Sequence, residues 1–143
     1  MSASLTLLGF DFGMKRIGVA IGQTVTQTAR PLTTLAAQDG VPALADVKAL
    51  FDKWRPDACV VGIPLNMDGT EQPVTLAARA FQQWLADQFH LPVHAMDERL
   101  STRSAREQVF ASGGFRALKK AEVDSFAAQI ILQDWLTQDS RQS

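Results

Sequence analysis

Apolar residues along the chain form short continuous runs in some places and recur every three or four positions in others. The continuous runs are typical of strands, and the recurring positions are typical of amphipathic helices. Five strands are predicted, over residues 5–11, 16–23, 30–36, 58–63 and 91–96. The turn signal Phe12-Gly13-Met14-Lys15 joins the first two strands, so we expect a hairpin there. Pro31 suits an edge position for the third strand.

Four helices are predicted, over residues 41–54, 73–89, from 101 or 104 to about 112, and 119–136. Pro56 stops the first helix, and Pro73 opens the second at a position that favours proline. Ser101 or Ser104 is expected to cap the third helix, because Ser104 and Glu107 fit a capping box. Helices and strands therefore alternate after the first three strands.

This order of elements predicts an α/β fold in which helices flank a mixed five-stranded sheet. A chain of 143 residues matches a single domain, and such a chain can bury roughly two thirds of its unfolded surface. We expect residues 1–138 to form the domain and residues 139–143 to be a short C-terminal tail.

The composition is that of an ordinary globular protein, with 46% apolar and 20% charged residues. No apolar run approaches the ~20 residues that cross a bilayer, and the N-terminus has no cleavable signal pattern, so we expect a cytoplasmic protein with no membrane partner. Cys59 lies in an apolar run and is predicted to be a buried, inert thiol. His90 and His94 lack the partners of a zinc site and are expected to be surface or structural residues.

The charge is unevenly distributed along the chain. The net charge of −1 argues by itself against a nucleic-acid partner. However, residues 99–120 hold six basic residues and one acid, Glu107, so this segment carries +5 and the remainder −6. Such a basic segment is what a phosphate backbone requires, although solvated charges on a helix and a loop would give the same pattern.

Three acids occupy positions that suggest chemistry. Asp11 ends the first strand, and Glu98 follows the last strand. If these two strands are parallel, both acids emerge at the edge of the sheet where ligands bind in α/β folds. Asp124 lies in the first turns of the last helix, on the side that can face the sheet. Each acid also has a structural alternative: closing the hairpin turn, pairing with Arg99, or favouring the helix N-terminus.

Convergence of these carboxylates would require a cation. At ~4–6 Å, each pair would repel by roughly 3–4 kcal/mol at an effective dielectric constant of ~20. Oxygen ligands select hard cations, which points to Mg²⁺ or Mn²⁺. Two such ions can hold the attacking water and the leaving oxygen of a phosphodiester. The basic segment between Glu98 and Asp124 would then lie beside the metal centre.

Four segments resemble the motifs of one protein family. They are GFDFGMKRIGVA at residues 9–20, VGIPLNMDGT at 61–70, DERLST at 97–102 and KKAEVDSFAA at 119–128. In this order they resemble the YqgF family, also called RuvX-like, which comprises nucleases for pre-16S rRNA that were earlier regarded as Holliday junction resolvases. Met14 stands where many members have threonine, at a turn position that is not a metal ligand.

The resemblance implies a ribonuclease H-like fold and a metal centre whose catalytic acids fall on Asp11, Glu98 and Asp124. Asp97 stays an alternative to Glu98, because neighbouring residues of a strand point to opposite faces and only one of them should enter the centre. The resemblance also implies substrate contacts near Asn66 and Gly69 and along residues 113–120. The residues expected to contact nucleic acid are Lys15, Arg16, Asn66, Arg99, Arg103, Arg116, Lys119 and Lys120.

Four functions are weighed on this basis. The first is an endonuclease for the 5′ end of pre-16S rRNA, acting on the free RNA or within a ribosomal particle, with metal-activated water as the nucleophile. The second is a resolvase for branched DNA, which would require a dimer, whereas the nuclease could be a monomer or a homodimer. The third is a non-catalytic nucleic-acid-binding factor in ribosome assembly or transcription. The fourth, an actin-like or sugar-kinase-like ATPase, would need a second domain.

Overall fold

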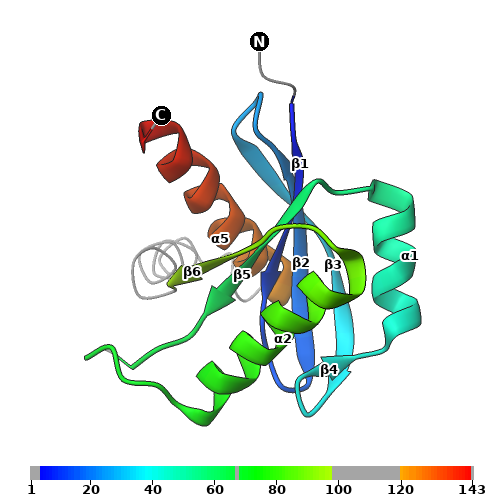
Figure 1. Cartoon of the computed structure of the whole chain (residues 1–143), viewed down its shortest axis with the longest axis vertical. Coiled ribbons are helices and arrows are strands. Elements are labelled where there is room, and N and C mark those ends of the chain that lie inside the picture. The colour runs from blue at the N-terminus through cyan, green and yellow to red at the C-terminus, as the bar shows by residue number, and fades with distance from the viewer. Residues whose placement is uncertain (1–3, 67, 98–119, 143) are drawn as a thin grey trace.

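A six-stranded mixed sheet forms the centre of the computed structural model, which describes residues 4–66, 68–97 and 120–142 (Figure 1). The order across the sheet is β4-β3-β2-β1-β5-β6. The pairs β4–β3, β3–β2 and β2–β1 are antiparallel, whereas β1–β5 and β5–β6 are parallel. The strands are β1 (Thr6–Asp11), β2 (Arg16–Gln23), β3 (Thr28–Gln38), β4 (Val41–Pro42), β5 (Ala58–Ile63) and β6 (Val93–Asp97).

The prediction of five strands was wrong by one, because β4 was taken as the start of the first helix. Asp39 and Gly40 have φ values of 52° and 81°, and they turn the chain so that Val41 and Pro42 pair with the end of β3. An Asp-Gly pair with positive φ at both residues is a strong hairpin signal. The helix therefore begins only at Leu44.

Three described helices lie on the two faces of this sheet (Figure 1). Helices α1 (Leu44–Trp54) and α2 (Pro73–Phe89) cover one face, and α5 (Lys120–Gln142) covers the other. The helix α5 continues beyond the predicted end at residue 136, and the helix predicted to end at about residue 112 lies outside the described residues. Within the described ranges, no helix is both long enough and apolar enough to cross a membrane.

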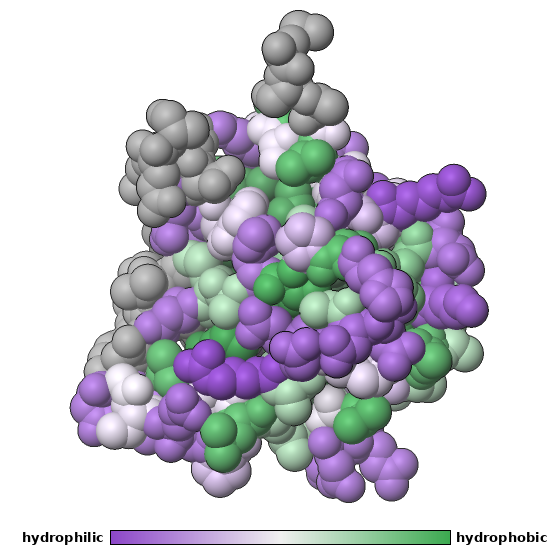
Figure 2. Space-filling model, viewed as in Figure 1, coloured by the Kyte–Doolittle hydropathy of each residue, from purple (hydrophilic) through white to green (hydrophobic). Residues whose placement is uncertain are grey.

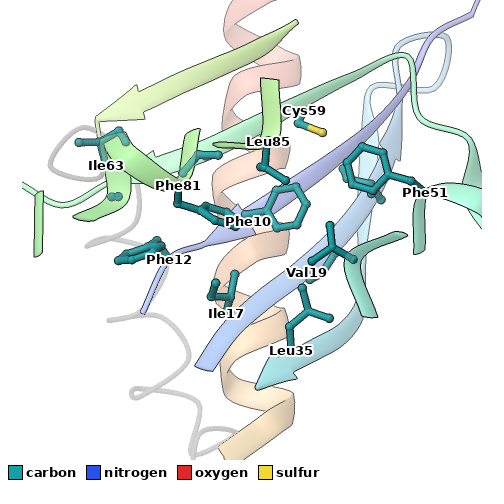
Figure 3. Packing of buried hydrophobic residues seen from close by; sticks show 14 of the residues in the cluster. Phe10, Phe12, Ile17, Val19, Leu35, Phe51, Cys59, Ile63, Phe81 and Leu85 are labelled. Atoms are coloured by element: carbon teal, nitrogen blue, oxygen red, sulfur yellow. The ribbon is translucent and has the colours of Figure 1, made fainter. Parts of the chain in front are cut away.

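The larger apolar cluster lies between the sheet and helices α1 and α2 (Figure 3). Phe10 of β1 and Val19 of β2 are fully buried there, and Phe81 of α2 packs on Phe10 with ring centroids 5.5 Å apart. The outer faces of α1 and α2 are mainly polar, with apolar residues in separate patches (Figure 2). The two helices are therefore amphipathic, as their spacing predicted.

A bulge interrupts the pairing of β2 with β3. Val19 lies opposite Thr33 and Ala20 opposite Pro31, so Leu32 is an extra residue in β3. Pro31 donates no backbone hydrogen bond, and the ladder is irregular at this point. The proline thus lies beside a bulge, a location that strands tolerate.

Cys59 lies within β5 and is fully buried, as predicted. Burial raises the pKa of its thiol far above the usual value, and the backbone hydrogen bond at Leu8 only partly opposes this effect. Because the thiolate is the reactive form, the native protein should hold this cysteine in an unreactive state.

Replacing Phe81 with alanine should lower the free energy of unfolding by about 3–5 kcal/mol, because the ring is only 3% exposed and contacts Phe10, Phe12 and Trp84. Urea unfolding followed by circular dichroism measures this loss. The matched control is Leu76→Ala on the same helix, where the side chain is 59% exposed and the change should stay within about 0.5 kcal/mol. Similar losses in the two variants would contradict the packing described.

The thiol of Cys59 should react with a disulfide reagent such as Ellman's reagent only when the protein unfolds, because its burial keeps the thiol protonated and inaccessible. The measurement compares the rate of thiol release in buffer and in denaturing urea. Cys59→Ala provides the blank. A fast reaction in buffer would show that the strand opens readily.

Candidate active site

Asp11 is the last residue of β1, at the carboxyl end of a strand with partners on both sides. It lies opposite Gly18 of β2 and in register with Gly62 of β5. Side chains alternate between the faces of a strand, and Leu7 of β1 packs in the cluster beneath α5. Asp11 therefore projects from the face of the sheet that α5 covers, where it is partly buried.

Gly18 allows α5 to approach this same point. A methyl group in place of its hydrogen would lie 1.9 Å from the carbonyl oxygen of Asp124, so only glycine fits. Because Gly18 is the ladder partner of Asp11, the start of α5 meets the sheet beside that acid. The structure thus places the backbone of Asp124 beside the ladder partner of Asp11, on the face of the sheet from which Asp11 projects.

An ion pair joins Asp124 to the first residue of β2. The Nε of Arg16 donates to Oδ2 of Asp124 at 2.8 Å. The aspartate side chain is 23% exposed and the arginine side chain 47%, so the pair lies at the rim of the site. Arg16, Gly18 and Ala20 alternate onto the face beneath α5, which explains why this arginine faces the helix.

The last residue of β6 is Asp97, in register with Ile63 of β5. Met96 is buried in the cluster beneath α5, so Asp97 projects from the opposite face, away from the face of Asp11. This placement keeps Asp97 off the face that carries Asp11. Glu98, the third predicted acid, lies outside the described residues.

The two described acids suit a hard cation. Both supply carboxylate oxygens, the donors that Mg²⁺ and Mn²⁺ prefer, and both are partly buried, Asp11 at the end of β1 and Asp124 in α5. Among the described residues, no group of three or more His, Cys, Asp or Glu side chains could hold a metal ion. A complete centre therefore needs a further ligand, and Glu98 is the expected one.

The two histidines have structural roles. His94 of β6 stacks on Trp135 of α5, with ring centroids 4.8 Å apart. His90 ends α2 in a left-handed conformation, and its backbone N–H donates to the carbonyl of Ala86 at 2.9 Å. Both placements agree with the expectation of surface or structural residues.

Two predicted nucleic-acid contacts lie in loops near this edge of the sheet. Lys15 is exposed in the turn after β1 and forms no ion pair within the described part of the chain. Asn66 is exposed after β5, and its side-chain amide donates to Oγ1 of Thr70 at 2.8 Å. A second bond, from the N–H of Gly69 to the carbonyl of Asn66, closes this turn. Asn66 therefore shapes its own loop, which is compatible with a substrate contact but does not require one.

The remaining predicted contacts cannot be placed in the same way. Lys120 begins α5, but its side chain is not among those described. Four further predicted contacts lie outside the described residues: Arg99, Arg103, Arg116 and Lys119.

Sequence reasoning missed two features that build the site. The first is the pairing of Arg16 with Asp124, because strand alternation indicates a face but not which helix residue covers it. The second is Thr75, fully buried at the start of α2. Its hydroxyl donates to the carbonyl of Pro64 and accepts from the N–H of Gln72 at 2.9 Å, so it ties the loop after β5 to the helix. The only signal was Thr75 at the third helical position after Gln72, the spacing of a capping box.

Comparison with known proteins identifies relatives over nearly the whole chain. The family described as "RuvX: Holliday junction resolvase" matches residues 5–138. A protein of Pectobacterium carotovorum is 54% identical over 132 residues, which cover 92% of this chain and 95% of that protein. A protein of Glaesserella parasuis is 50% identical over 137 residues, which cover 96% and 99%. Both bear the name "Putative pre-16S rRNA nuclease".

Solved structures share the architecture at low sequence identity. Thermus thermophilus RuvC in complex with a Holliday junction substrate has a TM-score of 0.58 and 19% identity, covering 95% of this chain and 96% of that chain. The yeast mitochondrial Holliday junction resolvase Ydc2 has a TM-score of 0.54 and 10% identity, covering 94% and 79%. These likenesses confirm the predicted ribonuclease H-like fold.

Proposed function

The chain belongs to the RuvX family, also called YqgF, and we propose that it is a metal-dependent endonuclease that hydrolyses phosphodiester bonds in pre-16S rRNA. The observation that carries the proposal is the placement of Asp124 against Gly18, the ladder partner of Asp11. Two carboxylates from separate elements, gathered at the carboxyl end of a central strand, form the core of a site for a divalent cation. The names of the close relatives support RNA as the substrate.

In this proposal Asp11, Asp124 and Glu98 hold Mg²⁺ or Mn²⁺. When bound, such an ion would supply Lewis-acid chemistry for phosphodiester hydrolysis, namely an activated water and stabilisation of charge on the phosphate. The protein contributes the geometry: β1 fixes Asp11 within the sheet, and the packing of α5 fixes Asp124. The described part of the site holds no histidine, because His94 is stacked on Trp135 and His90 ends α2.

The RNA backbone would approach along the edge of the sheet at which β1 ends. Lys15 is exposed in the turn directly after Asp11, which suits a phosphate contact. The segment of residues 99–120, with a charge of +5, would extend this positive surface beside the metal. Asn66 would contribute from the loop after β5.

A second candidate function is resolution of branched DNA, which the family's description as a Holliday junction resolvase favours. The same carboxylates would serve, because the chemistry of phosphodiester hydrolysis is shared. Symmetric cutting of a junction needs two active sites, so this function requires a dimer. Substrate choice and oligomeric state therefore have to be measured together.

Purified protein should cut end-labelled RNA that contains the 5′ leader of pre-16S rRNA when Mg²⁺ or Mn²⁺ is present, and a chelator should abolish the cutting. Asp11→Asn and Glu98→Gln should each lower the rate by more than about 100-fold, because even groups behind a metal ligand cost 10–100-fold. The assay includes a four-way DNA junction of matched length. Sedimentation of the same samples gives the oligomeric state.

The matched control is Asp97→Asn, which makes the same chemical change on the opposite face of β6. Its rate should stay within about threefold of the wild-type rate, because the side chain does not enter the centre. Symmetric cutting of the junction without cutting of the RNA would replace the first function with the second. RNA binding that is unchanged in all variants, with no cleavage, would leave a non-catalytic binding factor.

A further inference from the structure

Two residues of β2 contact Asp124. Gly18 packs against the backbone of Asp124, and Arg16 pairs with its carboxylate. We infer that Arg16 and Gly18 are positioning residues that fix Asp124 for metal binding, and that Arg16 is not a phosphate-binding cation. The inference rests on the proposed function, since it concerns the same metal centre. It assigns Arg16 a different role from the nucleic-acid contact expected from the sequence.

The backbone contact sets how far α5 stands from the sheet. A methyl group at Gly18 would lie 1.9 Å from the carbonyl oxygen of Asp124 and 2.9 Å from the nitrogen of Ser125. Both are backbone atoms within a helix, so they cannot rotate away as a side chain would. Any larger residue must therefore push the start of α5 outward, and Asp124 would move away from Asp11.

The side-chain contact sets the direction of the carboxylate. The Nε of Arg16 holds Oδ2 of Asp124 at 2.8 Å, a short bond between two charged groups. An exposed or half-exposed pair of this kind adds little to stability. Its effect is instead to restrict the rotation of Asp124, so that the carboxylate keeps one orientation toward the cation.

The middle of α5 is held by contacts other than the one at Gly18. The amide of Gln129 donates to the carbonyl of Ala29 at 2.9 Å, and Oε1 of Gln133 accepts from the N–H of Ala29 at 2.9 Å. Displacement caused at Gly18 should therefore stay at the start of the helix. This separation makes the role of Gly18 measurable without loss of the whole helix.

The charges of Lys15 and Arg16 have different surroundings although the two residues are adjacent. Arg16 is already paired with an acid, so a phosphate would have to compete with that carboxylate. Lys15 is exposed and has no acidic partner among the described residues. Neutralising Arg16 and Asp124 together leaves the net charge of the protein unchanged. A change in RNA affinity in that double variant would therefore report a direct contact of Arg16 with RNA.

The first experiment measures binding of a single-stranded leader RNA in the presence of chelator, by fluorescence anisotropy over a range of salt concentrations. The double variant Arg16→Gln/Asp124→Asn should bind with a Kd within twofold of wild type and with the same dependence on salt. Lys15→Gln is the comparison and should weaken binding more than the double variant does. A double variant that weakens binding as much as Lys15→Gln, or more, overturns the assignment of Arg16.

The second experiment measures Mn²⁺ affinity by isothermal titration calorimetry, without substrate. Gly18→Ala should weaken the affinity tenfold or more. Its matched control is Gly22→Ala on the same face of β2, which crowds the carbonyl oxygen of Thr28 and the side chains of Leu136 and Leu132, away from Asp124, and should leave the affinity within twofold of wild type. Circular dichroism and urea unfolding establish that both variants fold. Equal affinities in the two folded variants overturn the role of Gly18.

Arg16→Lys keeps the inference testable if Gly18→Ala does not fold. Lysine retains the charge but loses the planar guanidinium, so Mn²⁺ affinity should fall about threefold or more. Wild-type affinity in this variant overturns the orienting role. Both experiments measure equilibrium binding, whereas failure of the proposed function would appear as a wild-type protein that does not cleave RNA.

Discussion

The close contact between α5 and the hairpin of β1 and β2 is the constraint on which the site depends. Glycine at positions 9 and 18 lets the helix lie against the strands: a methyl group at Gly9 would lie 2.7 Å from Cβ of Leu132. The smaller apolar cluster and the glutamine bonds to Ala29 then fix the register of the helix along the sheet. These contacts hold α5 against the sheet, and the close approach at Gly18 sets where its first turns, with Asp124, meet β2.

The larger apolar cluster and the candidate acids lie on opposite faces of the sheet. The larger cluster beneath α1 and α2 contains the aromatic contacts of Phe81 and most of the buried volume. The acids lie on the other face, where the ion pair of Asp124 is partly exposed and contributes only about 0–1 kcal/mol. Substitutions at the acids should thus alter activity without unfolding the protein, so loss of activity in such variants can be interpreted directly.

The sequence predicted the central elements well and their long-range partners poorly. The bounds of β2 and β5 agree with prediction because both are continuous apolar runs, and Pro73 marked the start of α2. The strand β4 was missed because the Asp39-Gly40 turn was not recognised. The pairing of Arg16 with Asp124 spans 108 residues, and it depends on how α5 packs, which no local pattern specifies. Their positions in the sequence nevertheless indicated Asp11 and Asp124 as candidate metal ligands, since the ends of strands and the starts of helices can be predicted from local sequence.

The irregular outer part of β3 has a consequence for how the folded chain meets other chains. Within the described structure, β4 pairs only with Ala37 and Gln38, so most of β3 forms an outer border of the sheet. An open border of this kind can recruit a strand from another molecule and start aggregation. Pro31 lacks a donor there, and the bulge at Leu32 breaks the regular spacing of the rest. This border therefore offers no continuous template for pairing with a strand of another chain.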